Sequence, residues 1–291
     1  MPSAAELRQE LSARNLRMAA RSTMLHELTE GETPSVIFGR DPDLRHGNFH
    51  HASYRNILAN PCWAKRLTKV HTASRRSLPR AAWRWMELDC ANSSDALLMN
   101  VFCYTRSLTN RALAGMLGVP PLLAPEFGFK PRIPLRNQKT DQTEIDMKIG
   151  DLLIEAKLTE TDFQTAPLRM IERYRDIGEV FDCDELTRNR DLVPNYQLIR
   201  GTLAAASTGG SFCVLCDARR PDLIENWYSV MRTVKTCDLR CRLQLVTWQE
   251  LAAVLPEPLR KFLAMKYGIY SARSRDWHLF FPNRYHNPSF T

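Results

Sequence analysis

The chain has 291 residues, 44% of them hydrophobic and 25% charged, which is the composition of a folded globular protein that can bury a substantial core. This composition excludes a disordered chain, and no apolar run reaches the roughly 20 residues that a membrane-spanning helix needs. The first fifteen residues lack the apolar stretch of a signal peptide, so we expect a cytoplasmic protein without membrane contact, whose eight cysteines are reduced.

The net charge is +8, and the excess of basic residues is concentrated in one segment. Residues 44–86 carry nine Lys and Arg and no Asp or Glu, with aromatic residues between them. Such a segment can neutralise backbone phosphates and release their counterions, as nucleic-acid-binding proteins do. The alternative is a solvated basic face whose aromatic residues pack in a core. We favour a core role for the aromatic residues and a phosphate-facing role for the charges, in particular for Arg55, Lys65, Arg66, Lys69, Arg75 and Arg76.

Two clusters of potential zinc ligands are not expected to bind metal. Cys213 and Cys216 lie in a predicted strand, where residues three apart point to opposite faces. The histidines of HGNFHH, at residues 46–51, have no carboxylate or cysteine beside them at ligand spacing.

The N-terminal part of the chain is predicted to be helical. Ser3 and Glu6 form a capping box, which predicts a helix that runs to about Leu28. Irregular chain with short helical pieces is expected from there to about Pro79. We therefore treat residues 1–86 as a basic helical extension.

From residue 87 onward, helices and strands alternate. Ser93 and the two residues after it predict a helix start, and Gly118 ends a second short helix. Strands and helices follow, and their order predicts an α/β domain over residues 87–270 with a mixed β-sheet core flanked by helices, before a tail at 271–291. The predicted strands cover 126–135, 143–149, 152–158, 211–217 and 242–247, and the predicted helices cover 168–180, 195–207, 223–234 and two segments between Thr247 and Gly268.

The hairpin TEIDMKIGDLLIEAKLTE, residues 143–160, carries charges where a buried strand would carry valines. Gly150 and Asp151 predict a type II′ turn, which pairs residues whose numbers add up to 301. Asp146 then faces Glu155 with Cβ atoms about 4.5–5.5 Å apart, and two carboxylates this close are unfavourable unless one is protonated or a cation lies between them. Mg²⁺ accepts one or two carboxylates with waters and a phosphate, so we predict a metal site at Asp146 and Glu155. Lys157 would lie beside the ion, where it could stabilise charge on a phosphate or help to deprotonate water.

The opposite face of the hairpin, with Ile145, Met147, Leu152, Ile154 and Ala156, is expected to be the core face.

Asp146, followed by Glu155-Ala156-Lys157 after the apolar LLI, resembles the motif of the PD-(D/E)XK nuclease superfamily, although Ile145 replaces the motif proline. The segments ELD…SSDALLMNVF, TEID, EAKLTE and YQLIR are similar to those of a bacterial group of restriction-endonuclease-like proteins. The resemblance implies a core of helix, three strands, helix and strand (αβββαβ), and an endonuclease that cleaves double-stranded DNA with Mg²⁺ or Mn²⁺. It implies Asp146, Glu155 and the Ala156 carbonyl as metal ligands, Lys157 as the catalytic lysine, and auxiliary side chains among Glu87, Asp95, Tyr196, Gln197 and Arg200.

Several alternatives stay open at this point. Asp146-Met147-Lys148, with Asp141 upstream, also matches the short motif. The hairpin could instead face solvent, with Glu144 paired to Lys157 and Asp146 to Lys148, each pair contributing under ~1 kcal/mol. In function, the alternatives are a catalytically inactive nuclease-fold module that binds nucleic acid, and an RNA-processing nuclease. We also consider a homodimer, since cutting a duplex requires two active sites or two visits.

Overall fold

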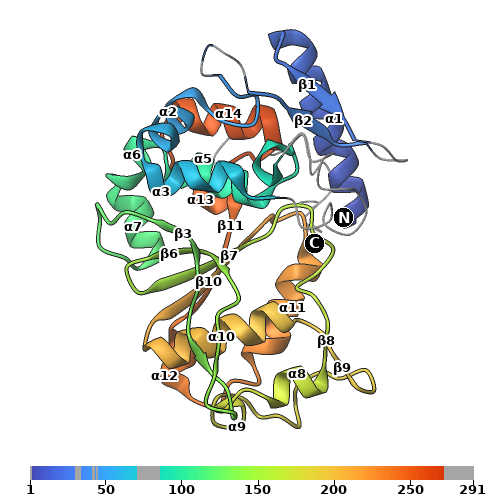
Figure 1. Cartoon of the computed structure of the whole chain (residues 1–291), viewed down its shortest axis with the longest axis vertical. Helices are drawn as coiled ribbons and strands as arrows, with labels where there is room; N and C mark the ends of the chain where they lie inside the picture. Colours follow the sequence, from blue (N-terminus) through green and yellow to red (C-terminus); the bar gives the residue numbers. More distant parts are fainter. Residues whose placement is uncertain (1, 30–33, 41–42, 44, 71–85, 272–291) are drawn as a thin grey trace, which may run out of the picture.

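The computed structural model describes residues 2–29, 34–40, 43, 45–70 and 86–271 (Figure 1). Its centre is a five-stranded sheet in the order β11-β10-β7-β6-β3. Strands β7, β10 and β11 are parallel, whereas β6 is antiparallel to both β7 and β3. The prediction of an α/β fold with a mixed sheet is therefore confirmed. The strands are β3 (Glu126–Phe129), β6 (Ile145–Ile149), β7 (Leu152–Ala156), β10 (Ser211–Cys216) and β11 (Leu243–Thr247).

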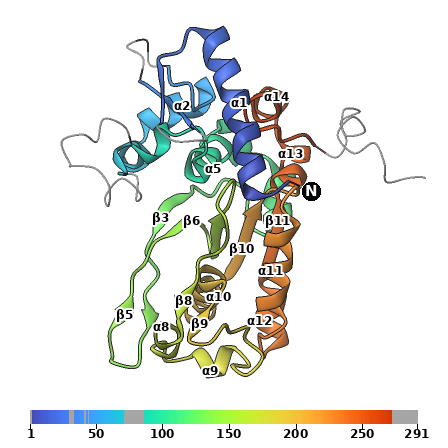
Figure 2. The ribbon, with the colours of Figure 1, turned by 90° about the vertical axis from the view of Figure 1, so that its right-hand side faces the viewer.

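Helices cover both faces of the sheet, as Figures 1 and 2 show. One apolar cluster joins the sheet to α1 (Ala4–Ser22), α5 (Ser94–Phe102), α7 (Arg111–Leu117), α13 (Trp248–Val254) and α14 (Glu257–Tyr267). The other joins it to α8 (Leu168–Glu172), α9 (Ile177–Val180), α10 (Tyr196–Thr208), α11 (Pro221–Met231) and α12 (Cys237–Cys241). Strand β7 is buried at every position because it lies in the middle of the sheet.

The expectation of a single core face for the hairpin is wrong. Leu153 packs in the cluster with α10 and α11, while Met147 and Ile154 pack in the cluster with α5 and α13. Ile145, expected beside Met147, belongs instead to the cluster of Leu153. Strand β10 shows the same two-sided burial, since Cys213 and Cys216 lie in different clusters, as their spacing predicted.

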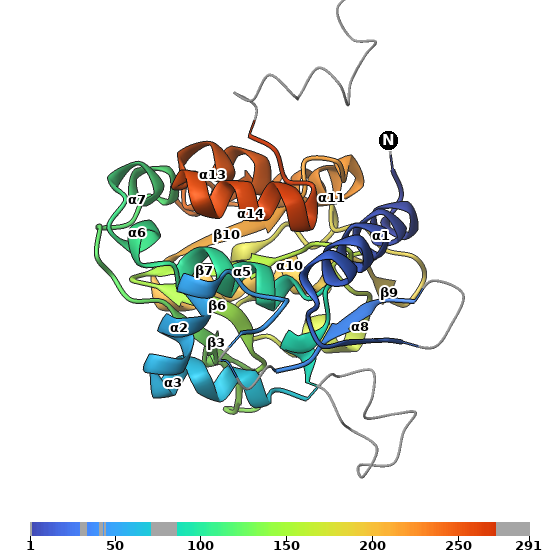
Figure 3. The same cartoon turned by 90° about the horizontal axis from the view of Figure 1, so that it is seen from above.

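The predicted N-terminal helix is confirmed but is shorter than expected. The Ser3–Glu6 capping box is present, and Leu7 and Leu11 are fully buried. The helix ends at Ser22, because Thr23 adopts a left-handed conformation with φ 51° and the following residues form β1 (His26–Leu28), which pairs with β2 (Val36–Phe38). Figure 3 shows α1 lying beside α14.

Short helical elements follow β2, as predicted. They are α2 (His51–Ala59), α3 (Pro61–Ala64) and the 3-10 turn η1 (Lys65–Thr68), and a second 3-10 turn, η3 (Glu87–Asp89), precedes α5. Phe49, Tyr54 and Trp63 are buried together, so the core role expected for these aromatic residues is confirmed. Trp83 and Trp85 lie outside the described residues.

Two predicted elements are interrupted. The strand expected over 126–135 ends at Phe129, because Pro131 has no N–H to continue a ladder. The chain resumes as β4 (Ile133–Pro134), which pairs with β5 (Thr140–Asp141) rather than with the central sheet. The single helix expected over 168–180 is two short helices, α8 and α9. The remaining elements are α6 (Thr105–Leu108) and the paired strands β8 (Ala166–Pro167) and β9 (Leu192–Val193).

Several positions in the described chain have the roles that their sequence indicated. Gly118 and Gly268 end α7 and α14 in left-handed conformations, and Thr247 with Glu250 forms a second capping box at α13. His46 bonds to Asp89, and His50 caps α2, so both histidines have structural partners. The boundaries at residues 86 and 270 stay a prediction. In the described residues, no helix is both long enough and apolar enough to cross a membrane.

Candidate active site

The turn between β6 and β7 has the geometry that the sequence predicts. Gly150 has φ 58° whereas Asp151 is not in the positive-φ region, as a type II′ turn requires. Met147 pairs with Ile154, Lys148 with Leu153 and Ile149 with Leu152, so the predicted register is confirmed. The ladder stops before Asp146, and the Asp146 carboxylate Oδ2 instead accepts a hydrogen bond of 2.8 Å from the backbone N–H of Ala156. The two strands thus separate at the point where the charged residues lie.

Glu155 and Lys157 form a buried ion pair at the end of β7. The two residues are only 2% and 5% exposed, and Lys157 Nζ donates to Glu155 Oε1 at 2.9 Å. Burial alone would lower the pKa of Lys157, but Glu155, Glu160 and Asp146 together raise it above its ordinary value. Lys157 therefore carries a proton at neutral pH.

Asp146 lies in a strongly negative environment. Burial, followed by the charges of Glu155 and Asp95, raises the pKa of Asp146 well above its ordinary value, and Lys157 offsets only part of this effect. Burial and the charges of two neighbouring carboxylates therefore both disfavour the ionised form of Asp146. A bound cation would favour the ionised form.

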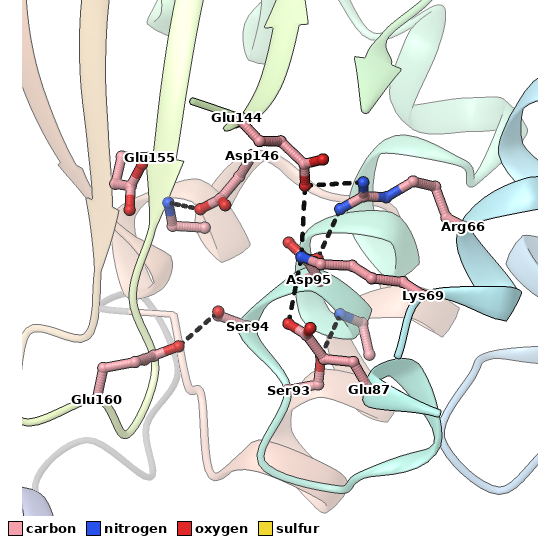
Figure 4. A network of polar contacts seen from close by, with 12 residues as sticks. Arg66, Lys69, Glu87, Ser93, Ser94, Asp95, Glu144, Asp146, Glu155 and Glu160 are labelled. Carbon is pink, nitrogen blue, oxygen red and sulfur yellow. Dashed lines mark hydrogen bonds and ion pairs between the residues drawn. The ribbon is translucent and has the colours of Figure 1, made fainter. Parts of the chain in front are cut away.

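A second group of charges lies beside Asp146, and we call it the Lys69 network: Arg66, Lys69, Glu87, Asp95 and Glu144 (Figure 4). Lys69 Nζ lies 2.7 Å from Asp95 Oδ2, and Arg66 bridges Asp95 and Glu144 at 2.8 Å each. Burial would raise the pKa of Asp95, but Lys69 and Arg66 outweigh burial and lower it. Asp95 is therefore a fixed, ionised side chain at the start of α5.

The basic residues expected to bind nucleic acid lie in different places. Arg66 and Lys69 point inward to the carboxylates of the Lys69 network rather than outward. Arg55 and Lys65 are exposed. Arg75 and Arg76 lie outside the described residues.

Helix α10 brings one of its three candidate side chains to Glu155. Gln197 Nε2 donates to Glu155 Oε1 at 2.6 Å, and Gln197 Oε1 is buried and without a hydrogen-bond partner in the described structure. Arg200, 2% exposed, donates to the carbonyls of Thr143 and Glu144 and so fixes the chain before β6. The Tyr196 hydroxyl bonds to that of Tyr174 at 2.8 Å.

The alternative motif is not assembled. Asp141 accepts bonds from Thr143 and Tyr174, and the ammonium group of Lys148 lies 4.6 Å from the centre of the Phe129 ring. Glu144 pairs with Arg66 rather than with Lys157. The hairpin therefore does not carry the solvent-facing pairs that the alternative interpretation required.

Glu160 also contributes to the site, and sequence reasoning did not include it. Glu160 Oε1 accepts from the Ser94 hydroxyl at 2.6 Å (Figure 4). Its Oε2 accepts from the backbone N–H of Leu158, also at 2.6 Å. These bonds tie the chain after β7 to the first turn of α5. The acid belongs to the quoted EAKLTE segment, but nothing in the sequence indicates that it meets Ser94.

The family model described as "Restriction Endonuclease associating with ARP" (REase-ARP) matches residues 15–268. The chain belongs to this restriction endonuclease family. Membership indicates a nuclease with DNA as its substrate, and it confirms the resemblance to restriction-endonuclease-like proteins. The matched range includes Asp146, Glu155 and Lys157 as well as the whole Lys69 network. No curated protein and no solved structure matches the chain.

Proposed function

We propose that this chain is a Mg²⁺-dependent endonuclease that hydrolyses phosphodiester bonds of double-stranded DNA, and that Mn²⁺ can replace Mg²⁺. The observation that carries the proposal is the meeting of Asp146, Glu155 and Lys157 where β6 and β7 separate. Family membership supports the DNA substrate.

The side chains at this point fit a hard divalent cation. In the described part of the chain no three His, Cys, Asp or Glu side chains are grouped as a ready-made metal site. Mg²⁺, however, is commonly bound by one or two carboxylates together with waters and substrate phosphate. The raised pKa of Asp146 is consistent with a cation here, because burial and the charges of Glu155 and Asp95 disfavour the ionised carboxylate and a bound cation would favour it. We assign Asp146, Glu155 and the Ala156 carbonyl as ligands.

The ion would polarise the phosphate and lower the pKa of a bound water. Side chains of the protein supply the other interactions at the site. Lys157 is held by Glu155 as an ammonium group, so we assign it to stabilising the charge that develops on the phosphate rather than to removing a proton from water. Gln197 orients Glu155 through its amide N–H, and its buried Oε1 is free to accept a hydrogen bond from a water.

One observation favours the catalytically inactive alternative. Lys157 and Gln197 both bond to Glu155 Oε1, so this oxygen already has two partners. If the pair stayed closed in the presence of metal, the chain would bind nucleic acid without cutting it. Such a module would bind DNA in a salt-dependent way that Asp146→Asn leaves unchanged.

Cleavage of supercoiled plasmid tests the proposal. The wild type should convert the plasmid to nicked and linear forms with Mg²⁺ and should stop when EDTA is added. Asp146→Asn, Glu155→Gln and Lys157→Ala should each lose at least about a hundredfold in rate, whereas Lys261→Ala on the exposed face of α14 should cut like the wild type. Equal cutting by all variants would refute the site assignment. RNA of matched sequence, run in parallel, separates the RNA-processing alternative.

We also propose that the chain acts with a partner. The family description includes an association with ARP, and the same association is proposed here. A homodimer would supply the two active sites that a double-strand cut needs. Light scattering of the purified chain, alone and with DNA, tests the dimer.

A further inference from the structure

Lys69 lies among three carboxylates that come from different parts of the chain. Its Nζ is 2.7 Å from Asp95 Oδ2, 3.3 Å from Glu87 Oε1 and 3.4 Å from Glu144 Oε1. Asp95 comes from α5, Glu87 from η3 and Glu144 from the chain just before β6 (Figure 4). A compact ammonium group with three acidic neighbours is arranged as a bound cation would be.

The Lys69 network keeps excess negative charge even with its two basic members. With all five side chains ionised, the three acids outnumber the two cations by one charge. The side chains of Asp95 and Arg66 are only 5% and 12% exposed, so solvent screens these charges weakly. Glu87 Oε2 is buried and has no hydrogen-bond partner in the described structure.

Asp146 lies between the two groups: its Oδ2 accepts from the backbone N–H of Ala156, next to Glu155, and Figure 4 shows its side chain beside Glu144 and Asp95 of the Lys69 network. In two-metal nucleases the ions lie about 3.5–4 Å apart, so that one carboxylate contacts both. Asp146 has the position of such a shared ligand. The side where the second ion would bind already holds Lys69 and Arg66, whose positive charges would repel it.

We propose that Lys69 is a built-in cation that takes the place of a second divalent ion beside Asp146, so that each chain binds one metal ion. The inference rests on the proposed function, because it assumes the metal site at Asp146 and Glu155. Lys69 acts as a positioning residue: it holds the carboxylates of Asp95 and Glu144 in place beside the site without contacting the substrate.

Counting bound Mn²⁺ tests this inference without any cleavage. Titration calorimetry, with free Mn²⁺ counted by electron paramagnetic resonance, should give one ion per wild-type chain, and Glu155→Gln should remove it. Lys69→Met should bind two ions, because three acids then face only Arg66, and one divalent ion neutralises the two excess negative charges. Adding Asp95→Asn to Lys69→Met should restore one ion. The control Lys261→Met, whose lysine pairs with Glu257 on α14, should bind one.

Two ions in the wild type, or one ion in a folded Lys69→Met protein, would overturn the inference. Should Lys69→Met not fold, thermal unfolding of Lys69→Gln replaces the count. Mn²⁺ should then raise the Tm of Lys69→Gln by more than that of the wild type, since a second ion adds binding energy to the folded state. Equal increases would overturn the inference as well. Failure of the proposed function appears separately, as a wild type that binds no Mn²⁺ sensitive to Glu155→Gln.

Discussion

The buried pair of Glu155 and Lys157 makes a quantitative prediction about stability. Their side chains are only 3% and 6% exposed, so removing one partner leaves the other charge buried without its ion-pair partner at 2.9 Å. Breaking such a pair costs about 3–5 kcal/mol. In Lys157→Met, Gln197 still donates to Glu155, and a hydrogen bond to a charged group is worth about 1.5–3 kcal/mol. We therefore expect Lys157→Met to lower the free energy of unfolding by about 3 kcal/mol, the lower end of the range for breaking such a pair.

A double-mutant cycle isolates the interaction between the two side chains. Lys157→Met and Glu155→Gln should each lower the free energy of unfolding, whereas the double variant should lose about 2–3 kcal/mol less than the sum of the two single losses. Urea unfolding in EDTA measures all four proteins, and an unchanged m value shows that stability alone has changed. Lys148→Met, on the same hairpin but beside the Phe129 ring, is the matched control and should cost at most about 1 kcal/mol. Additive losses would refute the buried pair.

Two further predictions concern the packing of α14 and of α10. Lys266 in α14 is fully buried, and its Nζ donates to Asn15 Oδ1. Burial lowers the pKa of Lys266 well below its ordinary value, so between the folded pKa and pH ~10 the unfolded chain binds a proton that the folded chain lacks. Wild-type stability should therefore rise with pH between the folded pKa and ~10. Lys266→Met should be more stable than the wild type at pH 7, and its stability should not rise with pH in this range. Tm values from pH 7 to 10 check this, and the same increase in the variant would contradict it. A Cβ at Gly201 would lie 2.3 Å from Phe212 Cζ, so Gly201→Ala should push α10 away from the sheet. We expect this substitution to lower the free energy of unfolding by about 1–3 kcal/mol. It should also slow cleavage, because the shift of α10 moves Gln197. A Cβ at Gly115 would meet no atom within 4 Å outside its own helix and chain neighbours, so Gly115→Ala should instead raise the free energy of unfolding by about 0.5–1 kcal/mol. Equal effects of the two substitutions in thermal unfolding would contradict the reasoning.

The parts of the fold that local chemistry determines could be predicted from the sequence. Gly150 and Asp151 determine the turn and thereby the register that brings Asp146 near Glu155. The two capping boxes likewise locate the starts of α1 and α13. These features depend on neighbours in the chain, so a single sequence contains the information.

The parts that depend on distant contacts could not be predicted. The two-sided burial of β7 follows from its central place in the sheet, which the pattern of the hairpin alone does not indicate. Arg66 and Lys69 appear in the sequence as part of a basic segment, and only the folded chain shows that Asp95 and Glu144 pair with them. The bond between Ser94 and Glu160 joins residues 66 positions apart and has no local signal.

The most direct test of the metal site is a crystal structure of the wild type grown with Mn²⁺, with data collected at a wavelength where manganese scatters anomalously. We predict one anomalous peak per chain, in contact with the carboxylates of Asp146 and Glu155, and no peak within the Lys69 network. A peak at other residues only, or no peak in crystals that contain saturating Mn²⁺, would contradict the proposed mechanism.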